Sequence, residues 1–399
     1  MKEVVIVGGV RTPIGNHGGA LRDVTAQELA RIVIRGVLDK TGLDPKLLDD
    51  VILGCIGQVS DAPNIARVAA LMAGLPTRTP AYTVQRNCVS GMVALSAAYQ
   101  AIQAGDGEVF LCGGTESMSN IPYIVRGARW GLKLRHTQFT DMLWEGLTDP
   151  VCGQIMGLTA ENLAMMYGLT RAELDEFAVQ SHKKAFIATR SGRFRDEIVP
   201  VMVSKKVAGE EVAREPVTQD EGINPALSVQ KAALYPAVFK ENGVVTPANS
   251  CPISDGAAAA IVMTREKADA LGFKPLASIR SYAYAGVPPE IMGLGPAYAA
   301  PKALARAGLT LKDMDLIEIN EAFAAQVLAV GRELEPAGWD WSKVNVNGGA
   351  IALGHPVGST GTRLVVTLLH EMIKRDAHLG LATACVGGGM GGAMIIERK

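Results

Sequence analysis

Two stretches of the chain align with each other at a constant offset of 266 residues: Gly42-Leu43-Asp44-Pro45-Lys46-Leu47-Leu48-Asp49-Asp50-Val51-Ile52-Leu53 and Gly308-Leu309-Thr310-Leu311-Lys312-Asp313-Met314-Asp315-Leu316-Ile317-Glu318-Ile319. Their glycines, lysines and apolar positions coincide. In each copy, a helix rich in Ala, Leu and basic residues ends at the glycine, a polar turn follows, and a strand begins. This repeat predicts a fold built from two related halves.

Both copies continue with the same kinds of element. A helical pattern covers residues 92–104 in the first copy and 362–374 in the second, and an apolar strand follows at 109–112 or 380–384. Further apolar strands close the halves at 257–263 and 393–396. Alternating strands and helices with nearly continuous apolar strands indicate an α/β fold in which helices cover the sheets.

Residues 119–249 have no counterpart in the second copy. We therefore expect a first half formed by residues 1–118 and 250–273, an inserted domain at 119–249, and a second half at 274–399. The insertion has its own helical patterns at 160–167 and 171–191. An insertion of this length is more typical of a substrate-covering or assembly domain than of a passive loop.

Composition excludes several classes of protein. The chain of 399 residues has 48% hydrophobic residues and a net charge of -1, so it shows no overall preference for nucleic acid or for a membrane surface. No apolar run approaches the roughly 18 residues of a membrane span, and the N-terminal run is too short for a signal peptide. Six cysteines without metal-like spacing fit reduced thiols, so a cytoplasmic enzyme is the expectation.

Cys88 lies in Asn87-Cys88-Val89-Ser90-Gly91, where the strand at 82–85 gives way to a helix. A thiol at a helix N-terminus meets unpaired amide groups and the positive end of the helix dipole, which stabilise a thiolate. An isolated cysteine is more often an inert buried residue. The small residues that open this helix favour a nucleophile instead.

Three further residues complete the candidate site. The repeat offset takes Cys88 to Gly354, next to His355, so these two side chains are expected at equivalent corners and suggest a Cys–His pair. Cys385 ends a strand and precedes Gly387-Gly388-Gly389, whose backbone N–H groups can hold an oxyanion. Asn320 follows the strand at 316–319; it either caps the next helix or points its amide into the site.

The motifs together resemble those of the thiolase family over essentially the full length. They are Asn87-Cys88-x-Ser90-Gly91, Asn320-Glu321-Ala322-Phe323, Asn347-Gly348-Gly349-Ala350-Ile351-Ala352-Leu353-Gly354-His355-Pro356 and Cys385-Val386-Gly387-Gly388-Gly389-Met390-Gly391. The resemblance implies a five-layered α-β-α-β-α body with an inserted loop domain over the substrate. It also implies assembly as a homodimer or as a homotetramer made of two dimers.

The resemblance assigns the catalytic roles. Cys88 is expected to carry the acyl group, with His355 as its base, and Cys385 to remove or supply a proton at C2 of the second acetyl-CoA. One oxyanion hole would combine His355 with a water held by Asn320. The other would use the backbone N–H groups of Cys88 and Gly387. CoA thioesters are substrates, and neither a cofactor nor a metal is implied.

The family's substrate contacts map less completely. Expected substrate or CoA contacts are Met156, Phe239, Ala248, Cys251, Met292, Phe323 and Lys231. Ile155 stands where acetoacetyl-CoA thiolases commonly place histidine, and Cys251 replaces a serine. An arginine often found near the CoA adenine is missing from residues 220–224, so Lys231 or the basic stretch around Arg135 is the candidate for the CoA phosphates.

The expected reaction is the reversible condensation of two acetyl-CoA to acetoacetyl-CoA and CoA. Three alternatives remain open from the sequence. The first is a degradative 3-ketoacyl-CoA thiolase of fatty-acid β-oxidation with broader chain length. The second is a β-ketoacyl synthase, which Cys385 argues against because that class does not use a second cysteine in such a turn. The third is a scaffold subunit that binds acyl-CoA.

Overall fold

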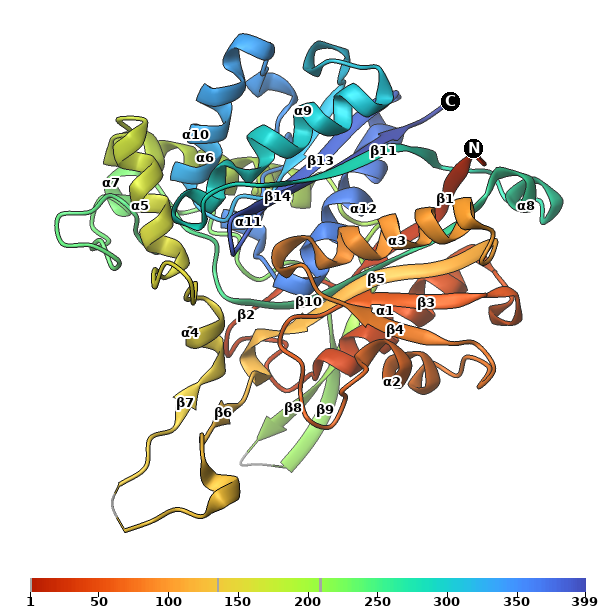
Figure 1. Cartoon of the computed structure of the whole chain (residues 1–399), viewed down its shortest axis with the longest axis horizontal. Helices are drawn as coiled ribbons and strands as arrows, with labels where there is room; N and C mark the ends of the chain where they lie inside the picture. Colours follow the sequence, from red (N-terminus) through yellow and green to blue (C-terminus); the bar gives the residue numbers. More distant parts are fainter. Residues whose placement is uncertain (1, 135, 208–209) are drawn as a thin grey trace.

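The two copies of the repeat form the two halves of one body (Figure 1). The computed structural model describes residues 2–134, 136–207 and 210–399. The strands of the first half lie side by side in the order β1 (Val4–Arg11), β10 (Ser254–Thr264), β5 (Val109–Ser117), β3 (Asp50–Gly54), β4 (Ala81–Val84). Those of the second half lie in the order β11 (Ala277–Gly286), β14 (Met390–Glu397), β13 (Leu379–Val386), β12 (Leu316–Ile319).

Strand directions repeat along with strand order. In the first half β10 is antiparallel to β5, and β5 is parallel to β3. In the second half β14 is antiparallel to β13, and β13 is parallel to β12. The helices before β3 and β12 both end at a left-handed glycine, Gly42 (φ 72°) and Gly308 (φ 71°), a conformation that glycine adopts without steric cost. The predicted duplication is confirmed.

The two halves are joined more closely than the sequence suggested. Strand β1 pairs with β11 in antiparallel fashion, with Val5 opposite Ser278 and Ile6 opposite Ala277. Edge strands of both halves therefore satisfy each other's backbone groups. The result is one hydrogen-bonded sheet that runs through the whole body.

The helices form three layers, and the strands of each half lie between two of these layers (Figure 1). Helices α3 (Ser90–Ala104) and α12 (Val357–Arg375) contribute to one apolar cluster together with strand residues of both halves. Residues 358–372 of α12 are all buried, as expected of a helix with protein on every side. Helices α1 (Ala26–Thr41) and α2 (Ile65–Met72) cover the outer face of the first half, and α9 (Gly295–Ala307) and α10 (Ala324–Leu334) that of the second. This is the expected α-β-α-β-α order.

The segment between β5 and β10 contains most of the remaining elements. Its helices are α4 (Met142–Gly146), α5 (Met156–Met166), α6 (Arg171–Arg190) and α7 (Val229–Ala232). It also forms two hairpins that the sequence patterns did not indicate, β6 (Tyr123–Ile124) with β7 (Thr140–Asp141) and β8 (Val201–Val207) with β9 (Glu210–Val217). Figure 1 shows β6 and β7 extending away from the body.

Short elements complete the chain. They are β2 (Gly15–Asn16), α8 (Arg265–Ala270), α11 (Ala350–Leu353) and the 3₁₀ helices η1 (Pro45–Leu47), η2 (Asn87–Val89), η3 (Met118–Asn120), η4 (Ala128–Trp130), η5 (Pro289–Leu294), η6 (Leu311–Asp313), η7 (Glu335–Ala337) and η8 (Trp341–Lys343).

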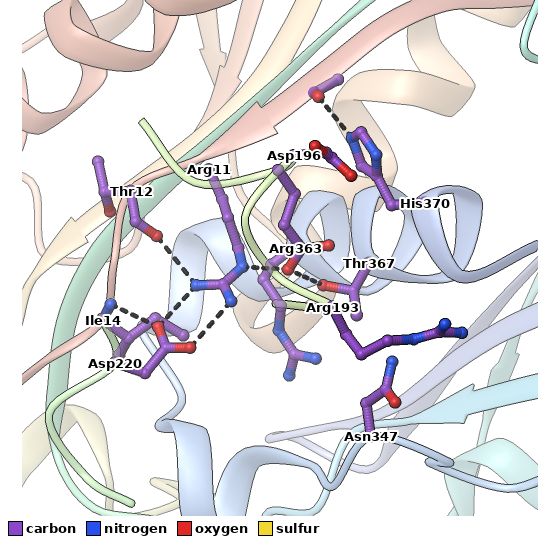
Figure 2. Close-up of polar contacts among 12 residues, drawn as sticks. Arg11, Thr12, Ile14, Arg193, Asp196, Asp220, Asn347, Arg363, Thr367 and His370 are labelled. Atoms are coloured by element: carbon purple, nitrogen blue, oxygen red, sulfur yellow. Dashed lines mark hydrogen bonds and ion pairs between the residues drawn. The ribbon is translucent and has the colours of Figure 1, made fainter. Parts of the chain in front are cut away.

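A buried arginine ties the inserted segment to the body (Figure 2). Arg11 on β1 donates from Nη1 and Nη2 to the two Asp220 carboxylate oxygens at 2.6 and 2.9 Å, and from Nε to Glu197 at 2.6 Å. Thr367 on α12 donates to the same Glu197 oxygen at 3.1 Å. Because every charge in this cluster has a hydrogen-bonded partner, the insertion is held firmly against β1 and the central helix layer.

Candidate active site

Cys88 lies in a turn between β4 and α3 that is held by several hydrogen bonds. It is part of η2, one residue before the first turn of α3, as the sequence predicts. Asn87 adopts a left-handed φ of 40° and donates its side-chain amide to the Gly387 carbonyl at 2.8 Å. Ser90 accepts from the Arg86 N–H at 2.8 Å and donates to the Asn87 carbonyl at 2.7 Å. These bonds fix the half-buried thiol at the start of the helix.

Close backbone contacts explain the small residues around this corner. A Cβ on Gly91 would lie 2.6 Å from Thr362 Oγ1 and 2.7 Å from its N on α12. A Cβ on Gly54, at the end of β3, would lie 2.5 Å from the Ser90 carbonyl carbon. Helix α3 therefore touches both α12 and β3 through its first turn, which confirms that the helix needs small residues for close packing.

His355 precedes α12 and is held by two hydroxyl groups. Its backbone N–H donates to Ser254 Oγ at 3.2 Å, and its ring Nδ1 lies 2.6 Å from Thr360 Oγ1. The Thr360 hydroxyl already donates to the Pro356 carbonyl at 3.0 Å, so it accepts from the imidazole. The proton is thereby assigned to Nδ1, and Nε2 keeps a lone pair that can accept another proton.

The corners of Cys88 and His355 are related but not identical. The 3₁₀ turn with Cys88 packs against α12, whose first residue follows His355 by two positions, so the repeat does bring the two elements together. In the first half, a four-residue strand, β4, leads to the corner. In the second half, the equivalent strand is reduced to one bridge between Ile317 and Val344, and α11 intervenes before His355.

Cys385 lies at the end of β13 and is fully buried. The chain then turns back into β14 through Gly388 and Gly389, whose φ values of 87° and 78° are readily available only to glycine. This turn leaves the Gly387 N–H facing the Cys88 sulfur, where it lowers the thiol pKa against the stronger effect of burial. The glycine turn after Cys385 thus supplies the Gly387 N–H as a backbone donor to Cys88.

Three thiols share the site, and burial dominates the behaviour of each. Burial raises the pKa of Cys88 to about 11 and that of Cys251 to about 12. Burial, followed by the neighbouring Cys88 and Cys251, holds the pKa of Cys385 well above its ordinary value. Backbone N–H groups do lower the Cys88 pKa, as the sequence suggests, but burial outweighs them and the net shift is upward in the substrate-free chain.

The imidazole experiences the opposite effect of the same environment. Burial, followed by the cationic Arg363 on α12, lowers the pKa of His355 to about 3. A cation is harder to form in a desolvated site, so His355 is neutral over the physiological range. In this range the His355 imidazole can accept a proton, but it carries no permanent positive charge.

Asn320 is fully buried and does not cap a helix. Its backbone N–H donates to the Thr383 carbonyl at 2.9 Å, so the pairing of β12 with β13 continues through this residue. Helix α10 begins four residues later and has no side-chain cap. Both amide atoms of Asn320 are buried and lack a hydrogen-bond partner among the described residues. An unpaired amide in this position is suited to a bound ligand.

Four of the expected substrate contacts come together beside Cys385. Met292 and Phe323 belong to the same apolar cluster as Cys385, and Met156 and Phe239 pack against it. Met156 Sδ lies 3.3 Å from the point where a Cβ on Gly387 would be, and the rings of Phe239 and Phe323 meet edge to face at 6.3 Å. These four side chains therefore share one apolar cluster with the buried thiol, and Met156 lies beside the turn that follows it.

The other expected contacts lie less directly at the site. Cys251 is anchored by its N–H to the Ala322 carbonyl at 3.0 Å and neighbours the two other thiols. Ala248 packs in a separate small apolar cluster with Val179 and Leu227. Lys231 is exposed on α7 and donates to the Ala226 carbonyl at 3.0 Å. Arg135 lies outside the described residues.

Several residues at the site carry no sequence signal that joins them to it. Ser254 and Thr360 orient His355, yet Ser254 is 101 positions away in the chain. Glu116 reaches the first turn of α12 from β5. Only the fold brings these groups together, although the small residues before Glu116, Gly113-Gly114, do mark a close backbone approach.

The described part of the chain contains neither a metal-binding cluster nor a membrane-spanning helix. Among residues 2–134, 136–207 and 210–399, no group of three or more His, Cys, Asp or Glu side chains could hold a metal ion. Over the same residues no helix is long and apolar enough to cross a membrane.

Comparison with known proteins identifies this kind of fold and site. Two family models match the chain, the thiolase N-terminal domain over residues 4–266 and the thiolase C-terminal domain over residues 273–398. The fold and the paired cysteine motifs are therefore those of a thiolase body. The chain belongs to the thiolase family, and the β-ketoacyl synthase alternative is set aside.

Individual relatives cover the whole chain. An acetyl-CoA acetyltransferase of Pseudomonas aeruginosa is 50% identical over 399 residues, 100% of both sequences. The crystal structure of the Bacillus anthracis acetyl-CoA acetyltransferase superposes with a TM-score of 0.96 at 45% identity, covering 100% of this chain and 99% of the other. Human mitochondrial 3-ketoacyl-CoA thiolase in complex with CoA superposes with a TM-score of 0.94 at 41% identity, covering 100% and 98%.

Proposed function

We propose that the protein catalyses the reversible condensation of two acetyl-CoA molecules to acetoacetyl-CoA and CoA, through an acyl group carried on Cys88. The observation that carries this proposal is the 2.8 Å hydrogen bond from Asn87, next to Cys88, to the carbonyl of Gly387, two residues after Cys385, because it joins the two cysteine motifs. One thiol can hold the acyl group while the other handles a proton, and the Gly387 N–H can stabilise the oxyanion between them.

In the first half-reaction Cys88 attacks the thioester carbonyl of acetyl-CoA. Cys88 is a neutral thiol with a pKa of about 11, and His355 is a neutral imidazole with a pKa of about 3. An ion pair of Cys88 thiolate and His355 imidazolium is therefore unfavourable in the free enzyme. Proton transfer to His355 Nε2 therefore accompanies the attack. Collapse of the tetrahedral intermediate breaks the bond to the CoA sulfur, which takes the proton from His355 and leaves as CoA thiol.

In the second half-reaction Cys385, in its thiolate form, removes a proton from C2 of another acetyl-CoA. The resulting enolate attacks the acyl carbon on Cys88, so a carbon–carbon bond forms and the carbon–sulfur bond to Cys88 breaks. The departing Cys88 sulfur takes the proton from Cys385, which restores the Cys88 thiol and the Cys385 thiolate. Two donor sets receive the developing negative charge: the N–H groups of Cys88 and Gly387 at the acyl carbonyl, and a water held by Asn320 at the enolate oxygen, where His355 donates only as the tautomer with its proton on Nε2. The unpaired Asn320 amide supports the second assignment.

Substrate length is the finer part of the proposal. Met156 lies beside Gly387, and Phe239, Met292 and Phe323 belong to or pack against the apolar cluster of Cys385, which supports a short acyl group. A broader 3-ketoacyl-CoA thiolase is the second candidate, supported by the 41% identity to the human mitochondrial 3-ketoacyl-CoA thiolase over the full chain. Lys231 is proposed to meet the CoA phosphates, with Cys251 and Ala248 beside the pantetheine arm.

Assembly and location complete the proposal. We place the protein in the cytoplasm as a homodimer or homotetramer. The inserted segment leaves large apolar side chains exposed on the single chain, among them Trp130 at 87% and Phe139 at 70%, and such side chains are typical of a protein interface. Sedimentation velocity of the purified protein measures the oligomer directly, and a monomer would remove this part of the proposal.

Thiolysis tests the activity. Purified protein is given CoA with acetoacetyl-CoA or with an eight-carbon 3-ketoacyl-CoA, and loss of the ketoacyl-CoA absorbance is followed. Activity confined to acetoacetyl-CoA supports the acetyl-specific enzyme, and comparable rates on both support the broader thiolase. Absence of turnover on either substrate would overturn the proposal in favour of an acyl-CoA-binding scaffold.

A further inference from the structure

A buried carboxylate with no role in the scheme above joins the element that carries Cys88 to the element that carries His355. Glu116 lies at the end of β5 and is 1% exposed. Its Oε2 accepts from the Gly358 N–H at 2.8 Å and the Ile56 N–H at 3.1 Å. Its Oε1 accepts from the Gly57 N–H at 2.8 Å and lies 3.6 Å from the Cys55 thiol.

The bond to Gly358 connects Glu116 with the histidine. Gly358 is in the first turn of α12, three residues after His355, where the backbone N–H groups have no partner within the helix. A carboxylate at this end also meets the positive pole of the helix dipole. Gly114, two residues before Glu116 on β5, contacts the same glycine, since a Cβ on Gly114 would lie 2.1 Å from the Gly358 carbonyl oxygen. Strand β5 thereby holds the first turn of α12 from two sides.

The bonds to residues 56 and 57 connect Glu116 with the cysteine. These residues follow Gly54 at the end of β3, and Gly54 is in backbone contact with Ser90 in the first turn of α3. The carboxylate therefore fixes three segments at once: the loop after β3, the end of β5 and the start of α12. Cys88 and His355 lie beside two of these junctions.

We propose that Glu116 is a positioning residue that sets the separation of Cys88 and His355 through Gly358. This inference rests on the proposed function of Cys88 and His355. It explains why an acid is buried where an apolar side chain would leave three backbone N–H groups without an acceptor. The Glu116 charge also makes a minor contribution, after burial, to the raised pKa of Cys88, and Cys251, Cys385 and His355 are the other titratable groups of the site.

Glu116→Gln tests the proposal, because it preserves shape but removes the charge and puts an N–H₂ group against backbone donors. The readouts are isotope exchange between CoA and acetyl-CoA, which needs only the first half-reaction, and the pH dependence of Cys88 alkylation by iodoacetamide, mapped by peptide mass spectrometry. We expect exchange kcat to fall about 100-fold, as for a displacement of about 1 Å, with KM within about twofold. The alkylation midpoint should move to lower pH, because the Glu116 charge contributes to the raised pKa of Cys88.

The matched control is Glu161→Gln. Glu161 is 4% exposed and likewise accepts backbone N–H bonds, from Val244 at 2.8 Å and Val245 at 2.8 Å, but it belongs to α5 and does not contact α12. This variant should lose thermal stability as Glu116→Gln does and leave the Cys88 alkylation midpoint unchanged. A general loosening of the fold would instead move the midpoint in both variants and overturn the proposal.

A double variant separates positioning from an independent effect. If Glu116 acts through His355, Glu116→Gln should reduce exchange by less than about twofold in a His355→Ala background. Full additivity of the two losses contradicts the proposal. So does wild-type exchange in Glu116→Gln, and either result leaves the proposed function intact because that function is read from the wild-type protein.

Glu116→Asp covers the case in which the Gln variant does not fold. It keeps the charge but is one methylene shorter, so it cannot reach all three segments. Reduced exchange with an unchanged alkylation midpoint supports the positioning role. Wild-type exchange in this variant overturns it.

Discussion

Cys88 and Cys385 lie at the same site in different kinds of surroundings. Cys88 is half-buried on a corner that opens a helix, with the Gly387 N–H directed at its sulfur. Cys385 is fully buried at the end of β13 within an apolar cluster. Burial raises both pKa values, but only for Cys88 does the Gly387 amide act against it. The two thiols therefore differ in solvation and in backbone hydrogen-bond donors, and this difference fits the separate tasks proposed for them.

The largest effect should follow removal of the half-buried thiol. Cys88→Ser should lower thiolysis by about 10⁴-fold or more, because an alkoxide is much harder to form than a thiolate and the acyl carrier is lost. Steady-state thiolysis of acetoacetyl-CoA measures the loss. Cys112→Ala, which removes a buried thiol from the central cluster, is the control and should keep turnover within about threefold. Equal losses in the two variants would make Cys88 a structural residue.

Removal of the Cys385 thiol should affect the two half-reactions to different extents. Cys385→Ser should reduce condensation by about 10³-fold, because proton removal at C2 loses its base. Exchange of isotope between CoA and acetyl-CoA, which uses only Cys88 and His355, should stay within about tenfold of wild type. Loss of exchange to the same extent as condensation would mean that the two thiols do not have separate tasks.

The unpaired amide near Cys385 should matter less than either thiol. Asn320→Ala should lower kcat by about 100-fold, the usual effect of removing one oxyanion donor from a desolvated site. Both half-reactions should be measured, because the proposed donor acts on the enolate and the exchange reaction should change little. A change confined to exchange would place Asn320 on the Cys88 side.

The smallest predicted difference concerns the free enzyme. Alkylation of Cys88 by iodoacetamide should still accelerate above pH 9 as the thiolate forms with a pKa of about 11, and Cys385 should react more slowly at each pH. The sign follows from burial, which favours the neutral thiol in both cases. Rates from quenched samples analysed by peptide mass spectrometry give both curves. A plateau for Cys88 at about pH 8 would mean that the backbone amides outweigh burial.

Much of the fold was accessible from the sequence. The repeat that begins at Gly42 and Gly308 predicted two halves, and strand order and direction confirm them. Helix starts were less accessible: the pattern placed a helix from Thr362, whereas α12 begins at Val357. The glycines in its first turns have low helix propensity but permit contact with α3 and β5, and packing decides the outcome. The two hairpins of the insertion and the pairing of β1 with β11 depend on contacts that no local pattern encodes.

The candidate site divides in the same way. Short motifs predicted Cys88, His355, Cys385 and Asn320 as the candidate catalytic residues, because catalytic side chains usually lie at the ends of rigid elements. The pKa of Cys88 could be predicted only in part, since a helix end is visible in the sequence and the degree of desolvation, which raises the pKa, is not. Glu116, Ser254 and Thr360 were missed because their partners are distant in the chain and are set by the fold alone.

Peptide mapping after acid quench tests the central claim most directly. Wild-type protein is mixed with acetyl-CoA in the absence of free CoA, quenched in acid, digested, and the mass of each cysteine-containing peptide is measured. The account predicts an added acetyl group on the Cys88 peptide and none on the Cys385 peptide. An acetyl group on Cys385, or no acetylated cysteine in a protein that is active in thiolysis, would contradict it.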